Sequence, residues 1–261
     1  ILLHLNLQLA RKVYISKSNK MTFVERIKYF LISVDFSITK SFLFSQSRFS
    51  KILKDFIYTK LYLLRNNFTI ILGKSDLNDF EIPKETVFHT KYSKCYLYKE
   101  CPEILKKIIK DHQNKIENYL GKNFLFEKVM YYETFNLPEI LLKEDVYSNI
   151  WHMDSHDGNK LLKIFILLQD VEDNDGPFVY LDRLSTKKNW RKLVNRWTFD
   201  KKFLNYDYDE QKKFLGKKGD YLIINTSICS HRASSPKVSR KMLVIDLFPR
   251  WTKNNNRKKY E

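Results

Sequence analysis

The residues of this sequence with the clearest capacity for chemistry are a histidine and an aspartate one position apart, His152 and Asp154. Successive side chains of a β-strand point to opposite faces, so on a strand these two would share a face and Met153 would point away. An imidazole and a carboxylate side by side can occupy two neighbouring positions around one metal ion. The pair therefore predicts part of a metal site whose third ligand comes from elsewhere in the chain.

His231 is the strongest candidate for the third ligand, because it comes shortly after a predicted strand over residues 221–225. Two histidines and one carboxylate leave the opposite positions of the metal open, which is the pattern of non-haem Fe(II) oxygenases. His156 is the alternative donor, since it would share the strand face of the first pair. Asp157-Gly158-Asn159 predicts a turn, however, and a turn would carry His156 away from the metal.

The elements that position these residues are predicted to be short strands. They are rich in Val, Ile, Phe and Tyr and are separated by turn residues such as Asn174-Asp175-Gly176-Pro177. Many short strands with such turns predict an antiparallel sandwich or jelly roll. The predicted strands cover residues 124–133, 147–154, 161–168, 178–181, 221–225 and 242–248.

Helices are predicted mainly before and between these strands. Residues 102–120 form the best helical pattern, with Pro102 in the first turn and Gly121 after the end. Residues 185–218 predict a charged, partly helical insertion. The first 85 residues show helical spacing of apolar side chains and no catalytic motif. We therefore expect an α+β protein, with an N-terminal helical region over 1–85 that packs on a jelly-roll domain over 86–261.

Two blocks of the sequence resemble the phytanoyl-CoA dioxygenase family of 2-oxoglutarate-dependent oxygenases. The first is WHMDSHDGNKLLKIFILLQDVEDNDGPFVYL and the second is GDYLIINTSICSHRASSPKVSRKMLVIDLFPR, and the similarity extends over about residues 125–250. Family members often follow Gly-Pro-Phe with a Gly-Ser-His turn, whereas Tyr180 here is followed by Leu181-Asp182-Arg183. That departure concerns the loop on the substrate side and not the metal.

The resemblance implies a double-stranded β-helix that binds Fe(II) through His152, Asp154 and His231, with 2-oxoglutarate anchored by Arg240. It implies hydroxylation of a small-molecule or lipid-type substrate by dioxygen, with release of succinate and carbon dioxide. Arg240 suits the far carboxylate of 2-oxoglutarate, because a planar guanidinium can donate two parallel hydrogen bonds. Lys241 and Arg250 are the alternatives for this role.

Five further residues lie near the predicted site, and for each of them a role in packing or exposure to solvent is a simpler explanation than a role in the chemistry. Lys163 is expected to face solvent, although its strand could bring it to the pocket. Arg232 should point away from the metal, because it adjoins His231, and should serve folding. One of Tyr131 and Tyr132 should face the core, and Cys229 is expected to be a buried thiol.

The composition sets limits on the partners of the protein. Its 261 residues include 47 Lys and Arg against 30 Asp and Glu, a formal net charge of +17. The basic residues are scattered, so no specific nucleic-acid partner is expected. A nucleic-acid-acting oxygenase, a basic nucleic-acid-binding protein and a catalytically silent jelly roll remain the alternatives.

The cysteines and the hydropathy bear on the compartment. Cys95, Cys101 and Cys229 form no CxxC pair, which argues against a disulfide framework and a structural zinc site. The sequence contains no run of about 18 apolar residues, so no membrane span is predicted. A reducing cytoplasm is therefore expected. The sequence opens at Ile1 without an initiator methionine, as expected of a fragment or a processed product.

Overall fold

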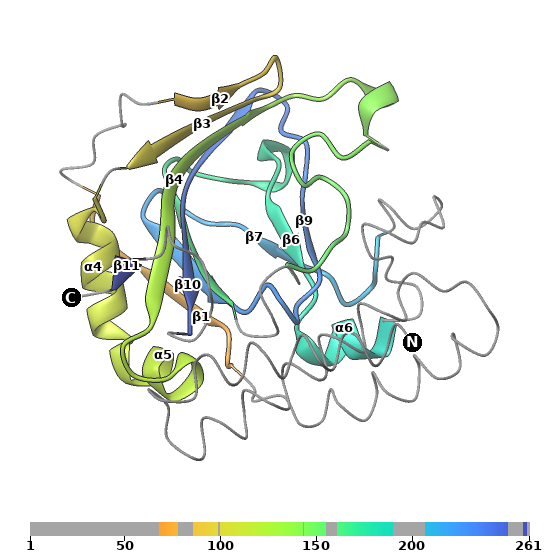
Figure 1. The fold of residues 1–261 in the computed structure, drawn as a ribbon. Coiled ribbons are helices and arrows are strands. Elements are labelled where there is room, and N and C mark those ends of the chain that lie inside the picture. The colour runs from red at the N-terminus through yellow and green to blue at the C-terminus, as the bar shows by residue number, and fades with distance from the viewer. Residues whose placement is uncertain are drawn as a thin grey trace, which may run out of the picture. The chain divides into compact units, whose positions relative to one another are not determined.

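Two antiparallel sheets form the framework of the protein in the computed structural model (Figure 1). The structure describes residues 68–77, 86–98, 100–142, 144–154, 161–189, 207–249 and 258–259. The chain divides into two units, and all the described residues belong to the one that spans 67–154 and 160–261. The helical pattern expected before residue 67 therefore lies outside the described residues.

The large sheet has the strand order β1-β8-β5-β10-β4-β3-β2, with β11 also paired to β4, and all its pairings are antiparallel. Its edge strand β1 lies before residue 86, the position at which the jelly-roll domain was expected to begin. The bounds are β1 Ile71–Lys74, β2 Thr86–His89, β3 Ser93–Tyr98, β4 Leu125–Phe135, β5 Leu162–Leu167, β8 Asp220–Ile224, β10 Ser239–Phe248 and β11 Lys258–Lys259.

The small sheet consists of β7 (Lys212–Phe214), β6 (Phe178–Tyr180) and β9 (His231–Ala233), again antiparallel. From β4 onward the chain passes repeatedly between the sheets. After β4 and β5 in the large sheet it visits the small sheet at β6 and β7, returns to the large sheet at β8, visits the small sheet again at β9 and returns at β10. The predicted antiparallel architecture of many short strands is confirmed.

The strand predicted over residues 147–154 is wrong. Only His152 in this segment makes a β-bridge, and it pairs with His231. The chain bends before it, because Ser148 has a positive φ of 64° and the Asn149 side chain accepts a hydrogen bond from the Val146 amide. Side-chain capping of a turn competes here with strand pairing.

The helix predicted over residues 102–120 is two helices, α4 (Glu103–Asp111) and α5 (Gln113–Leu120). His112 leaves the helical conformation, with φ −113° and ψ 12°, and its Nε2 hydrogen-bonds with the Tyr221 hydroxyl on β8 at 2.8 Å. No proline or glycine marks this break, so a tertiary contact overrides the helical pattern. The insertion predicted over 185–218 overlaps α6 (Arg183–Asn189) and contains β7.

The two faces of the large sheet serve different purposes. On one face, apolar side chains of β4, β5, β8 and β10 pack with α4 and α5 in a hydrophobic core. The opposite face packs towards the small sheet, where Phe165, Met242 and Val244 form a second core with residues such as Phe178. None of the described helices has the length and the apolar character needed to cross a membrane.

Gly176 is a point where the fold depends on one residue type. It has a φ of 69°, and a Cβ atom there would lie 2.5 Å from the Pro236 nitrogen and 2.7 Å from the Ser234 carbonyl oxygen. Its own carbonyl accepts a hydrogen bond from the Arg240 guanidinium. The glycine that the sequence places in a turn is thus also a contact of the predicted co-substrate anchor.

We expect Gly176→Ala to lower the free energy of unfolding by about 2–4 kcal/mol, since left-handed strain and backbone crowding each cost about 1–3 kcal/mol. Denaturant unfolding of the metal-free protein measures this. Gly216→Ala is the matched control, because the three atoms nearest its Cβ would all belong to the Asp220 side chain and not to the backbone. Equal losses in the two variants would contradict the argument.

Candidate metal centre and adjoining pocket

The two histidines are brought together by backbone pairing. The His152 amide donates to the His231 carbonyl at 3.0 Å, and the His231 amide donates to the His152 carbonyl at 2.9 Å. This pair of hydrogen bonds sets the two imidazole rings beside each other, with centroids 4.3 Å apart. Asp154 is held by its own amide, which donates to the Thr226 carbonyl at 2.9 Å.

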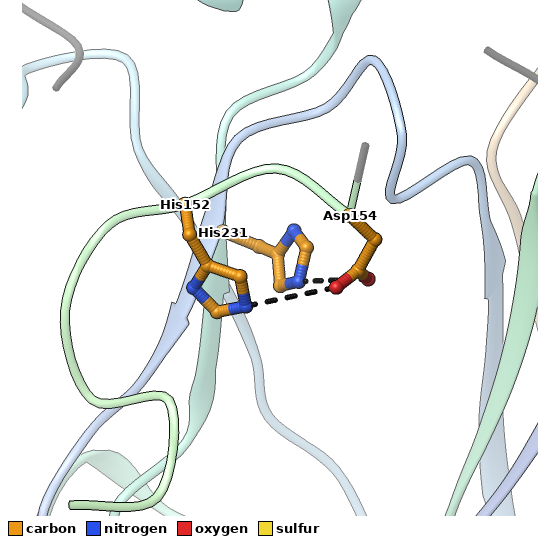
Figure 2. Close-up of side chains that lie close together, drawn as sticks. All are labelled: His152, Asp154 and His231. Carbon is orange, nitrogen blue, oxygen red and sulfur yellow. Dashed lines mark ion pairs between the residues drawn. The ribbon is translucent and has the colours of Figure 1, made fainter. Parts of the chain in front are cut away.

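The three side chains converge on one point (Figure 2). His231 Nε2 lies 3.4 Å from Asp154 Oδ2, and His152 Nε2 lies 3.9 Å from Asp154 Oδ1. One potential ligand atom from each residue lies within 4.8 Å of the others, so the group could hold a metal ion. The imidazoles are 4% and 3% exposed and the carboxylate 13%, so the site is largely removed from water.

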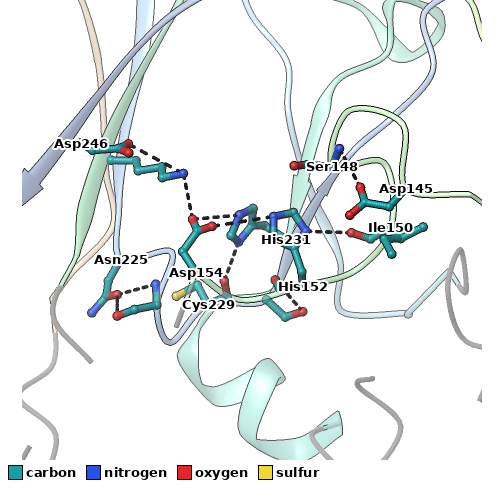
Figure 3. Close-up of polar contacts among 12 residues, drawn as sticks. Asp145, Ser148, Ile150, His152, Asp154, Asn225, Cys229, His231 and Asp246 are labelled. Carbon is teal, nitrogen blue, oxygen red and sulfur yellow. Dashed lines mark hydrogen bonds and ion pairs between the residues drawn. The ribbon is translucent and has the colours of Figure 1, made fainter. Parts of the chain in front are cut away.

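The hydrogen bonds of the rings indicate what belongs between them. His152 Nδ1 contacts the Ile150 carbonyl oxygen at 2.8 Å, and His231 Nδ1 contacts the Cys229 carbonyl oxygen at 3.0 Å (Figure 3). A carbonyl oxygen only accepts, so each Nδ1 carries a hydrogen. In a neutral imidazole the Nε2 lone pair then faces the carboxylate. Three electron-pair donors pointing at one another fit a cation, and such Nδ1 contacts are usual for metal-bound histidines.

Asp154 is ionised in this setting. Burial raises its pKa, but nearby positive charge, first of all the Lys163 ammonium, outweighs burial and holds the pKa well below its usual range. Lys163 Nζ lies 2.9 Å from Asp154 Oδ2. The expectation that Lys163 faces solvent is therefore wrong: its side chain is 19% exposed and contacts a predicted ligand.

A pocket of about 210 Å³ adjoins the three residues. Alternation along β4, β5 and β10 selects its wall, because side chains two positions apart share a face of a strand. The large sheet contributes Met130, Tyr132, Thr134, Lys163, Phe165, Arg240, Met242 and Val244. The neighbours of these residues in sequence, such as Leu162, Ile164 and Leu243, face the helices.

Arg240 is the cation of this pocket that the sequence singles out, and it is 6% exposed. Its Nη1 donates to the Gly176 carbonyl, while its Nε has no hydrogen-bond partner among the described residues. Burial lowers the pKa of Arg240 to about 10, against the smaller opposing effect of Tyr147, so the guanidinium remains charged near neutral pH. Thr134 pairs with Arg240 in the β4–β10 register, and its hydroxyl is also buried with no hydrogen-bond partner in the part of the chain that the structure describes.

The two alternatives to Arg240 differ from it. Lys241 is 40% exposed, does not line the pocket and lies 3.8 Å from Glu133. Arg250 lies outside the described residues, and so does His156, the alternative metal ligand.

The remaining expectations are mostly confirmed. Arg232 turns away from the predicted metal ligands, pairing with Asp207 at 2.9 Å and lying 5.4 Å from the centre of the Trp151 ring. Cys229 is buried, at 2% exposed. Tyr131 is buried and packs against Tyr96, whereas Tyr132 lines the pocket.

Two polar residues of this region were missed from the sequence, Thr134 and Asp246. Asp246 lies 3.7 Å from Lys163 and is its register partner between β10 and β5. The sequence could have indicated Asp246. It lies an even number of positions from Arg240 on the same strand, so the two side chains share a face. A carboxylate on the strand face that carries the anchor would be expected to meet a cation.

Comparison with known proteins does not assign the chain to a family. No protein-family model and no curated protein matches it. Among solved structures, HygX from Streptomyces hygroscopicus with nickel, 2-oxoglutarate and hygromycin B bound is 14% identical, with 64% of this chain and 74% of that chain covered and a TM-score of 0.41. The epimerase SnoN in complex with Fe3+, alpha ketoglutarate and nogalamycin RO is 12% identical, with 63% and 68% covered and a TM-score of 0.41.

The non-heme monooxygenase ThoJ in its nickel complex is 14% identical, with 56% of this chain covered and a TM-score of 0.34. The match covers 52% of ThoJ, so the chain spans about half the length of that protein. At these identities and TM-scores the similarity assigns no family, and the function has to be inferred from the site itself.

Proposed function

We propose that the protein is an Fe(II)- and 2-oxoglutarate-dependent oxygenase that hydroxylates a small-molecule or lipid-type substrate. One observation carries this proposal: the convergent donors of His152, Asp154 and His231 share a pocket with the buried guanidinium of Arg240. A metal site alone would fit many activities. A metal site together with a buried cation that has no carboxylate partner in the described residues calls for an anionic ligand of the metal.

The donor set favours iron. Two imidazoles and one carboxylate leave open positions on the metal and are typical of non-haem Fe(II) oxygenases, whereas structural zinc sites are usually closed by four protein ligands. The bound iron would supply the activation of dioxygen. The protein would hold the metal through the Nε2 atoms and the Asp154 carboxylate, with the Nδ1 hydrogen bonds fixing the ring orientations.

2-Oxoglutarate fits the rest of the pocket by charge. It is a dianion whose oxo-acid end can chelate a metal and whose far carboxylate needs a cation. Arg240 would neutralise that carboxylate, and the free Thr134 hydroxyl beside it offers one further hydrogen bond. Phe165, Met242 and Val244 line the space between with apolar groups, which would exclude water from the reaction.

The finer parts of the proposal concern fold and family. Alternation of strands between two sheets is what a double-stranded β-helix requires, and this supports the proposed jelly roll. The sequence blocks that resemble the phytanoyl-CoA dioxygenase family contain all four proposed site residues. We therefore retain a phytanoyl-CoA dioxygenase-like enzyme as the working hypothesis for its substrate class.

The net charge does not favour the nucleic-acid alternatives. In the described part of the chain, five exposed lysines are paired with nearby carboxylates. These pairs are Lys106–Glu103, Lys188–Glu210, Lys212–Asp182, Lys213–Asp173 and Lys217–Asp170. Such pairing reduces the local field that would attract a polyanion.

Anaerobic titration with Fe(II) and 2-oxoglutarate tests the proposal. We expect a weak visible charge-transfer band that requires both components, because the oxo-acid must chelate the metal. Succinate in place of 2-oxoglutarate is the control, since it lacks the oxo group and should give no band. Absence of the band contradicts the proposal. A band without succinate formation on admitting dioxygen and candidate substrates would instead favour a catalytically silent protein.

A further inference from the structure

Lys163 lies between two carboxylates, one of which is a proposed metal ligand. Its Nζ is 2.9 Å from Asp154 Oδ2 and 3.7 Å from Asp246 Oδ1. The Lys163 side chain is only 19% exposed. Burial of its charge costs free energy, and nearby carboxylates must compensate that cost.

The arrangement differs from a surface ion pair in what it restrains. Asp246 pairs with Lys163 in the register between β10 and β5, so the lysine is held by a paired strand of the large sheet. Asp154 belongs to no strand. Its side chain depends on contacts of this kind for a fixed orientation.

We propose that Lys163, held by Asp246, is a positioning residue that turns the Asp154 carboxylate towards the two imidazoles before a metal ion arrives. By engaging Oδ2, the ammonium leaves Oδ1 as the oxygen without a lysine partner. The inference rests on the metal-binding half of the proposed function and not on 2-oxoglutarate. It adds Lys163 and Asp246 to the residues that determine metal affinity.

Two effects of Lys163 on the metal have opposite signs, and this makes the inference testable. An ammonium close to a cation repels it, so charge alone predicts that removal of Lys163 strengthens metal binding. Removal also frees the Asp154 carboxylate to turn away from the imidazoles, and losing such a partner of a metal ligand typically weakens binding about 10–100-fold. We expect the second effect to dominate.

The test is the affinity for Co(II) alone, measured by calorimetry on the full chain. Lys163→Met should bind Co(II) about 10–100-fold more weakly than the wild type. Lys163→Gln should recover part of this loss, because an amide N–H can still donate to Asp154. Asp246→Asn should show a smaller loss, since it removes only the group that holds the lysine. Lys241→Met is the matched control, a lysine beside a carboxylate outside the pocket, and should bind as the wild type does.

Equal or tighter Co(II) binding by Lys163→Met overturns the inference, and so does a loss that Lys163→Gln does not reduce. If Lys163→Met fails to fold by thermal unfolding, the Gln and Asp246→Asn variants decide the result in the same way. A wild-type protein that binds no metal overturns the proposed function together with this inference. A wild type that binds Co(II) but gives no band with Fe(II) and 2-oxoglutarate contradicts only the proposed function.

Discussion

We expect replacement of His152, Asp154 or His231 with alanine to abolish tight Fe(II) binding while leaving the apo fold largely intact. Each replacement removes one of three convergent donors, so the loss should exceed the roughly 10–100-fold cost of removing a partner of a ligand. The backbone hydrogen bonds between His152 and His231 do not depend on the side chains and should persist. Anaerobic metal titration measures the affinity, and thermal unfolding without metal reports the fold.

His156→Ala is the control for these variants. The turn predicted after His156 would carry its side chain away from the metal, so this variant should keep the wild-type affinity for Fe(II). Loss of Fe(II) binding in His156→Ala would mean that the third donor was chosen wrongly. Wild-type affinity and turnover in any of the three ligand variants would remove that residue from the site.

The second large effect is expected at Arg240. Arg240→Ala should raise the 2-oxoglutarate concentration for half-maximal succinate formation well over tenfold, with Fe(II) affinity little changed. Breaking a buried charge pair costs about 2–5 kcal/mol, and Arg240 is buried in the pocket with no carboxylate partner in the described residues. Arg240→Lys should fall between, because an ammonium keeps the charge and loses the two parallel donors.

Succinate formation against 2-oxoglutarate concentration, at saturating Fe(II), measures this effect. Lys241→Ala is the matched control, since Lys241 is the next residue on β10 and does not line the pocket. An unchanged half-saturation point in Arg240→Ala would rule out the anchoring role and direct attention to Arg250. A parallel loss of Fe(II) affinity would instead assign Arg240 to the metal centre or to folding.

The proposed metal ligands could be predicted because the spacing of His152 and Asp154 in the sequence already suggests that they share a site. His152 and Asp154 were expected on one face of a strand, and they do converge, although the segment forms only a single bridge. The prediction that these two side chains lie together was therefore right, although the predicted strand was wrong. Long apolar strands such as β5 and β10 were predictable as well, because burial on both faces requires continuous Val, Ile, Leu and Phe.

Other features depend on partners that a local pattern does not contain. β7 and β9 have three residues each and exist through their pairing with β6. The break at His112 follows from a hydrogen bond to Tyr221, on a distant strand. The position of Lys163 follows from the register of β5 against β10, which brings it to Asp246 and to Asp154. The sequence around Lys163 alone therefore does not indicate that this lysine is buried.

The pairing of His152 with His231 also bears on how the protein matures. These residues are far apart in the sequence, so their two backbone hydrogen bonds form only after a long loop has closed, and loop closure costs entropy that later contacts must offset. An early folding intermediate would therefore offer no complete set of donors. We expect iron to enter an already folded chain, and stabilisation by metal to slow unfolding rather than to accelerate folding.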